Sequence, residues 1–169
     1  MTKYIALLRA VNVGGTKLPM ADLTAICHDA GFSKVKTYIA SGNVVFESKA
    51  GAATVKAELE QRLLTHAGKP IGVVLRTAGE MQAVLKANPF PKAAPNHTYA
   101  FFLNEAPPKD ALESARGIQD EQMRRGKREI YVHYPSGMGK SKLKLAAAQS
   151  GTARNVNTIA ALADMASKL

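Results

Sequence analysis

The stretch VKTYIASGNVVFE (residues 35–47) decides how the first half of this chain folds. Two largely apolar runs, Val35–Ile39 and Asn43–Glu47, flank the short segment Ala40-Ser41-Gly42, which is typical of two strands joined by a turn. A stretch with helical periodicity lies on each side of this pair of strands. The topology of the first half therefore depends on how these flanking segments continue.

The flanking segments complete the order of elements. Lys3–Val11 is mainly apolar on both faces of an expected strand, which indicates a central strand covered on both sides. Helices are expected over residues 19–31 and 55–68, because each has an apolar stripe that ends at a glycine. Ile71–Arg76 supplies a further strand. The order β-α-β-β-α-β predicts an α+β unit of the ferredoxin-like kind.

The second half begins like the first but shares no evident sequence with it. It predicts a related β-α-β-β-α unit that ends in helices instead of a fourth strand. The expected elements are strands at His97–Leu103, Gln119–Arg125 and Arg128–Tyr134, and helices from Pro107 to Gly117, after Gly139 and over Asn157–Leu169.

The predicted organisation has a ferredoxin-like subdomain at residues 1–77, a helix and proline-rich linker at 78–96, and a second α+β subdomain at 97–169. Thr77 and Glu80 have the spacing of a capping box that begins the linker helix. That helix should end before Asn88-Pro89, because residues preceding proline avoid helical geometry.

Charge is the main compositional signal about function. The 23 basic and 13 acidic residues give a formal net charge of +10, which favours anionic partners such as nucleic acid, phosphorylated metabolites or acidic proteins. Solubility alone is an equally simple explanation of the charge. The excess is concentrated between Arg116 and Arg154, so we expect the second half to carry most of it.

The lone cysteine and the absence of a leader pattern suggest a cytoplasmic protein. Cys27 has no partner for an internal disulfide and lies on an apolar helix face, where we expect a buried, unreactive thiol. The first residues lead directly into a strand, and no apolar run reaches the length of a membrane span, so no membrane association is expected.

Polar residues that suit an anion site lie at the ends of the expected elements. The glycine pair at 14–15 exposes backbone amides between basic side chains, and further polar residues follow the turn at 40–43 and precede the last two helices. We expect the ligand-binding residues to be Arg9, Asn12, Gly14, Gly15, Lys17, Ser41, Asn43, Lys140, Arg154 and Asn155. Each also has a structural explanation as a turn or helix-cap residue.

Several familiar motifs are incomplete in this chain. Gly139-Lys140-Ser141 follows a strand, but Tyr134 stands where a phosphate-binding P-loop has its first glycine. Asn43 and Val45 offer no ring where RNA-recognition domains stack bases. The isolated histidines form no metal-ligand pattern, so no metal is expected, and neither catalytic residues nor a cofactor can be assigned.

Segments spread over nearly the whole chain resemble the bacterial family called domain of unknown function 1697. They are residues 9–15, 19–20, 31–32, 37–46, 88–90, 141–143 and 152–158. The resemblance implies two α+β subdomains, the first ferredoxin-like, and no established activity. Ala10, Ala40 and Val156 replace a glycine, a glutamine and a tryptophan that are common in the family.

Three kinds of function fit these observations. The leading hypothesis is a protein that binds a phosphate-bearing or other anionic partner, either nucleic acid or a phosphorylated small molecule. The alternative is an enzyme acting on a small anionic substrate, with Lys17 or Lys140 stabilising negative charge but no evident general base. In the third reading the protein has a structural or interaction role and no ligand site. The oligomeric state is left open.

Overall fold

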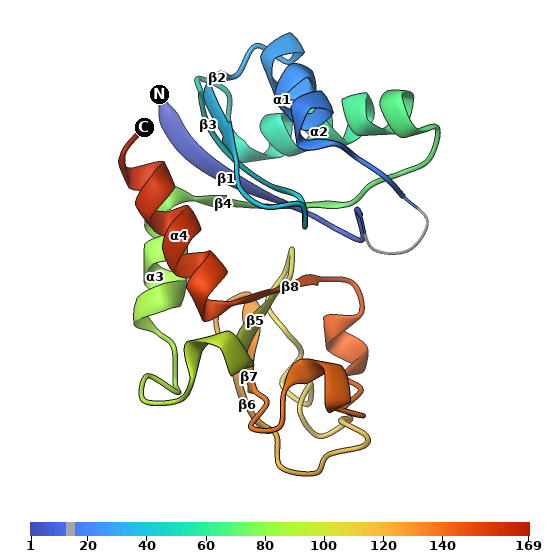
Figure 1. The fold of residues 1–169 in the computed structure, drawn as a ribbon, viewed down its shortest axis with the longest axis vertical. Helices are drawn as coiled ribbons and strands as arrows, with labels where there is room; N and C mark the ends of the chain where they lie inside the picture. Colours follow the sequence, from blue (N-terminus) through green and yellow to red (C-terminus); the bar gives the residue numbers. More distant parts are fainter. Residues whose placement is uncertain (13–15) are drawn as a thin grey trace. The chain divides into compact units, whose positions relative to one another are not determined.

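The computed structural model describes residues 1–12 and 16–169. The chain divides into two compact units, Met1–Met81 with Leu162–Leu169, and Gln82–Ala161. Each unit contains one four-stranded antiparallel sheet (Figure 1). Within the described residues, no helix has both the length and the apolar character needed to cross a bilayer.

The first sheet has the strand order β2-β3-β1-β4. Its strands are β1 (Thr2–Leu8), β2 (Ser33–Thr37), β3 (Asn43–Ser48) and β4 (Val73–Thr77), with α1 (Met20–Asp29) between β1 and β2 and α2 (Ala52–Ala67) between β3 and β4. β1 pairs antiparallel with both β3 and β4, so it is central, as predicted. This order confirms the ferredoxin-like prediction for the first unit.

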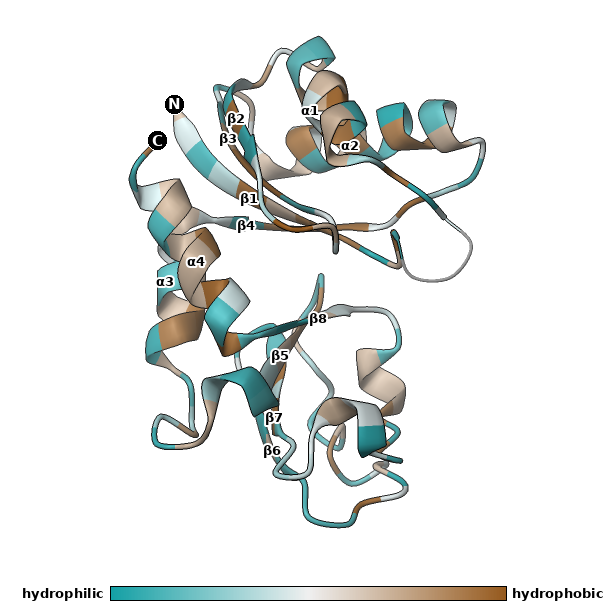
Figure 2. Ribbon diagram, in the orientation of Figure 1, coloured by the Kyte–Doolittle hydropathy of each residue, from teal (hydrophilic) through white to brown (hydrophobic). Residues whose placement is uncertain are grey.

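The two helices pack against one face of this sheet. Leu8 of β1 and Phe46 of β3 share a core cluster with Leu23 of α1 and Leu59 of α2. Figure 2 shows apolar residues along much of β1 and β3, and alternating apolar and polar residues in both helices. The residues of β1 that point to the other face are buried too, which explains why both faces of that strand are apolar.

Cys27 lies on the buried side of α1 and is fully enclosed in the core cluster. Burial raises the pKa of its thiol to about 12, so the thiol stays protonated and unreactive at neutral pH. The prediction of a buried cysteine is therefore confirmed.

The helix ends follow the sequence signals closely. Gly31 follows the end of α1 with φ of +86°, and Gly68 ends α2 with φ of +72°, a left-handed conformation that glycine adopts without strain. The backbone N–H of Thr77 donates to Glu80 Oε1 at 2.8 Å, and the N–H of Glu80 donates to Thr77 Oγ1 at 3.1 Å. The predicted capping box therefore starts α3 (Ala78–Lys86), which ends before Asn88-Pro89.

The second sheet repeats the strand order of the first, as β6-β7-β5-β8. A 3-10 helix η1 (Pro95–His97) precedes β5 (Thr98–Phe102), and the other strands are β6 (Gln122–Arg125), β7 (Glu129–His133) and β8 (Thr152–Asn155). The last helix, α4 (Val156–Ser167), follows β8 directly. The predicted relationship between the two halves is therefore confirmed in the strand order of their sheets.

The structure differs from the sequence prediction at three places in the second unit. The stretch from Pro107 to Gly117 forms successive turns and no helix, although Ala111, Leu112 and Ala115 pack in the apolar cluster. A segment this short has little helical stability of its own. The expected helix after Gly139 is replaced by two 3-10 helices, η2 (Met138–Lys140) and η3 (Ala146–Ala148). The unit also has the fourth strand, β8, that the sequence interpretation lacked.

The segment between η2 and η3 is extended for a reason visible in its sequence. Leu143 and Leu145 pack in the apolar cluster, whereas Lys142 and Lys144 are exposed, and this alternation has the period of a strand. Lys144 accordingly forms an isolated antiparallel bridge with Arg116. A leucine- and alanine-rich composition suggested a helix, but the spacing of the residues favours an extended chain.

Candidate functional site

Three loops of the first unit meet at one end of β1. The backbone N–H of Leu8 donates to Gly42 O at 2.8 Å, and that of Arg9 donates to Gly72 O at 2.9 Å. The carboxamide of Asn12 donates to Ala40 O at 2.7 Å. The segments 9–12 and 40–43, which the sequence analysis singled out separately, are therefore neighbours.

Asn12 uses its side chain to hold these loops in place. Its Nδ2 donates to Leu18 O at 2.8 Å as well as to Ala40 O, and its Oδ1 accepts the backbone N–H of Leu18 at 2.8 Å. Its φ of +57° is one that asparagine tolerates better than most residues. Both amide hydrogens of Asn12 are thus engaged within the protein, which assigns this residue a structural role.

The turn between β2 and β3 is organised around Asn43. This side chain is fully buried, and its Nδ2 donates to Tyr38 O and to Ser41 Oγ, each at 2.9 Å. Gly42 has φ of +88°, and a Cβ there would lie 2.5 Å from Val11 Cγ2. Only glycine fits that position, because both the backbone conformation and the close approach exclude a side chain.

The cations of this region differ in exposure. Arg9 is half-buried, and its Cδ lies 3.0 Å from the point that a Cβ on Gly72 would occupy. Lys17 is exposed and lines a pocket of about 370 Å³ together with Asn12 and Ala40. Gly14 and Gly15, the expected amide cradle, lie outside the described residues.

The predicted site residues of the second unit have separate environments. Lys140 is exposed at the end of η2, a single 3-10 turn, so the helix N-terminus expected beside it is absent. Arg154 is buried, and its Nη1 donates to Thr152 Oγ1 at 2.6 Å and to Ala153 O at 2.9 Å. Desolvation by burial lowers the pKa of Arg154 to about 10, so the guanidinium keeps its charge at neutral pH.

Asn155 is the N-cap of α4. Its Oδ1 accepts the backbone N–H of Thr158 at 2.9 Å, the bond expected from a cap to the third residue of a helix. Of the candidates, Arg9, Asn12, Lys17, Ser41 and Asn43 belong to the first unit, whereas Lys140, Arg154 and Asn155 belong to the second. That these residues form one anion site stays a prediction.

Sequence reasoning overlooked Glu121, which joins two connecting segments of the second unit. This nearly buried carboxylate accepts the backbone N–H of Gln119 at 2.7 Å and the hydroxyl of Ser141 at 2.7 Å. Those two donors lower its pKa below the ordinary value. The only feature of the sequence that could have drawn attention to Glu121 is its acidic side chain within a strongly basic stretch.

The histidines have environments that do not require a metal. His66 lies 3.4 Å from a carboxylate oxygen of Asp22, and His133 Nδ1 lies 3.1 Å from Thr98 Oγ1. Across residues 1–12 and 16–169, no group of three His, Cys, Asp or Glu side chains is placed to hold a metal ion.

The fold is therefore α+β, with two sheets of ferredoxin-like strand order. The family model described as "Protein of unknown function (DUF1697)" matches residues 1–131, and this chain belongs to that family. The conserved bacterial protein SP0830 from Streptococcus pneumoniae has a similar solved structure, with a TM-score of 0.81 and 28% identity over 98% of both chains. No curated protein matches the chain.

Proposed function

We propose that this protein binds nucleic acid through the phosphate backbone, using exposed cations of its second unit. The observation that supports the proposal is the burial of most acidic residues between Arg116 and Lys144. Glu121 and Glu129 are buried, which leaves Asp120 as the exposed carboxylate of this stretch. The exposed cations there are Arg116, Arg124, Arg125, Lys127, Lys140, Lys142 and Lys144.

The fold brings part of this charge together. The backbone of Arg116 bonds to that of Lys144 in both directions, at 3.0 and 2.8 Å. Asp120 accepts the hydroxyl of Ser136 at 2.7 Å, so the chain before β6 runs beside the chain after β7. The lysines at 140, 142 and 144 therefore lie on a segment that is attached to the basic stretch beginning at residue 116.

The spread of these cations favours a polymer over a small phosphorylated molecule. Lys17 is the cation in the pocket around Asn12, and Lys144 is the cation in the pocket beside Phe101. Tight binding of a single phosphate group usually requires several donors that converge on it. Cations distributed over a surface instead match the regularly spaced phosphates of a nucleic acid.

The first unit gives no support for base stacking. Asn43 and Val45 of β3 are fully buried, so β3 offers no aromatic platform for stacking bases. Contacts to phosphate carry little sequence information, so we propose weak sequence preference and strong dependence on salt. We also propose that the protein is cytoplasmic, as its lone cysteine, Cys27, suggests. Contact of Arg9 and Lys17 with the nucleic acid is an additional prediction.

Fluorescence anisotropy of a labelled DNA or RNA duplex tests the proposal. The variant Lys127→Glu/Lys140→Glu/Lys142→Glu should bind at least about tenfold more weakly at low salt. The slope of log K against log salt should also become shallower by about 0.9 for each phosphate that the variant no longer neutralises.

The matched control is Lys36→Glu/Lys49→Glu/Lys69→Glu, which changes three exposed lysines of the first unit and alters the net charge by the same amount. It should retain most of the affinity. Absence of binding by the unmodified protein at low salt, or an equal loss in both triple variants, would refute a specific basic surface.

A further inference from the structure

One face of the second sheet is covered by irregular chain. Tyr99 and Phe101 of β5 pack with Ile130 and Val132 of β7 in an apolar cluster. In the first unit two α-helices cover the corresponding face, but here the connections contain only turns and the short helices η2 and η3. Phe101 remains half-buried on a central strand as a result.

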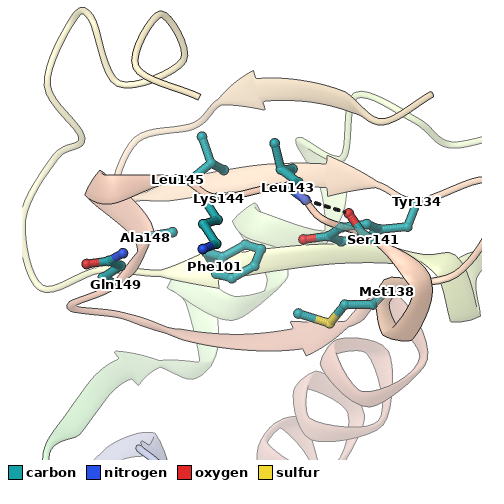
Figure 3. Close-up of a pocket in the computed structure, with 9 residues that line it drawn as sticks. All are labelled: Phe101, Tyr134, Met138, Ser141, Leu143, Lys144, Leu145, Ala148 and Gln149. Atoms are coloured by element: carbon teal, nitrogen blue, oxygen red, sulfur yellow. Dashed lines mark hydrogen bonds between the residues drawn. The ribbon is translucent and has the colours of Figure 1, made fainter. Parts of the chain in front are cut away.

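A pocket of about 380 Å³ lies beside Phe101 (Figure 3). Its size is within the range of small-molecule sites, roughly 300–1,000 Å³. The apolar part of its lining comes from Phe101, Leu143, Leu145 and Ala148, all of which belong to the apolar cluster or pack against it. A planar apolar group of a ligand could contact the ring of Phe101 and the surrounding aliphatic side chains in this pocket.

Lys144 supplies the positive charge of this pocket. Figure 3 draws its side chain next to Phe101, between Gln149 at one end and Ser141 at the other. The two backbone bonds to Arg116 fix the segment that carries Lys144. Its ammonium group has no ion-pair partner among the described residues and can accept an anionic group of a ligand.

The polar end of the pocket is held by hydrogen bonds. Ser141 Oγ donates to Glu121 at 2.7 Å and accepts the backbone N–H of Leu143 at 3.1 Å. Glu121 does not line the pocket and its carboxylate is bonded by donors of the protein, but its negative charge still acts on Tyr134, which does line the pocket. Burial raises the pKa of Tyr134 to about 12, so its hydroxyl remains protonated and can donate a hydrogen bond.

We infer that this pocket binds a small aromatic carboxylate, with the ring against Phe101 and the acidic group on Lys144. A single ammonium matches a single carboxylate, and the apolar lining disfavours a heavily charged phosphate ester. The two proposals share Lys144, but their tests are separate, because none of the lysines changed in the nucleic-acid test lines the pocket.

Indole-3-acetate is a suitable probe because the chain contains no tryptophan, so indole emission reports on the ligand alone. Its fluorescence should shift to shorter wavelength and its anisotropy should rise on titration with the protein. A molecule of this size should bind with a Kd of about 0.1–1 mM. Indole-3-acetamide, which has the same ring without the charge, should bind about tenfold more weakly.

Variants separate the roles of charge and ring. Lys144→Gln should weaken indole-3-acetate about tenfold and leave indole-3-acetamide unchanged, whereas Lys142→Gln, a change of an exposed neighbour outside the pocket, should affect neither. Phe101→Leu should weaken both probes, with circular dichroism confirming that the variant is folded. The inference fails if neither probe binds at tens of millimolar, or if Lys144→Gln and Lys142→Gln have the same effect.

Discussion

Asn12 connects two loops of the first unit by three side-chain hydrogen bonds. Asn12→Ala should therefore lower the free energy of unfolding by about 2 kcal/mol, because each bond contributes about 0.5–1.5 kcal/mol and alanine disfavours a positive φ. Urea denaturation followed by circular dichroism measures the change.

The variant Asn12→Gly isolates the backbone contribution. Glycine also removes the three bonds but adopts φ of +57° readily, so it should be less destabilised than Asn12→Ala by roughly 1 kcal/mol. Equal stability of the unmodified protein and both variants would show that these bonds do not hold the loops.

At this scale the sequence identifies unusual residues better than it identifies their roles. The turn residues Gly42 and Asn43 and the cap residue Asn155 were all expected to be special, and each has a definite place in the structure. A sequence lists donors and acceptors, but it does not show which backbone groups approach them. The burial of Arg154 could not be predicted because it depends on the missed strand β8.

Asn155 caps the N-terminus of α4, so substitutions at this residue test the stability of that helix. Asn155→Ala should cost about 1 kcal/mol of stability, whereas Asn155→Asp should preserve it, because aspartate caps as well as asparagine. Thermal denaturation distinguishes the two variants. A ligand-binding role would instead predict that both variants lose affinity for nucleic acid while Asn155→Asp remains fully stable.

Glu121 links the chain before β6 to the chain after η2, and this link should depend on pH. Because folding lowers its pKa, the ionised carboxylate contributes its full stabilisation above the ordinary value of 4.5 and loses it as the pH falls through the lower, folded value. Glu121→Gln should therefore lose less stability than the unmodified protein between about pH 7 and about pH 3. Parallel acid titrations of stability by denaturant unfolding measure the difference, and identical pH profiles would contradict the prediction.

Elements with strong periodicity were predictable, and short ones were not. The stripe containing Leu23 and Cys27 gave α1, and the one containing Leu59 gave α2. In contrast, β8 is only four residues long, and its polar residues resemble a helix cap as much as a strand. Its pairing with β5 is a long-range contact, which no local pattern encodes.

At the scale of the whole molecule, α4 begins in the second unit while its last residues group with the first. Leu162 is fully buried, so Leu162→Ala should destabilise the protein by about 3 kcal/mol. Since Leu162 belongs to the first unit, hydrogen exchange should accelerate in β1. Asp164→Ala, an exposed change on the same helix, should stay within about 0.5 kcal/mol and is the control. If β1 kept its protection from hydrogen exchange in Leu162→Ala, the assignment of Leu162 to the first unit would be contradicted.

The fold class and the family were within reach of the sequence, because the order of strands and helices in the first half is complete and motifs recur along the whole chain. The basic character of the second half was also visible. Composition could not show that Glu121 and Glu129 are buried. Because they are, the exposed residues of this stretch are more strongly basic than its composition suggests. The pocket beside Phe101 was invisible too, since it depends on helices that do not form.

The strand β6 lies at the edge of its sheet and presents Arg124 and Arg125 to solvent. An open edge of this kind invites the same edge of another molecule to add to the sheet, and repulsion between like charges opposes that contact. We therefore expect the arginines of β6 to oppose edge-to-edge pairing between copies of the chain.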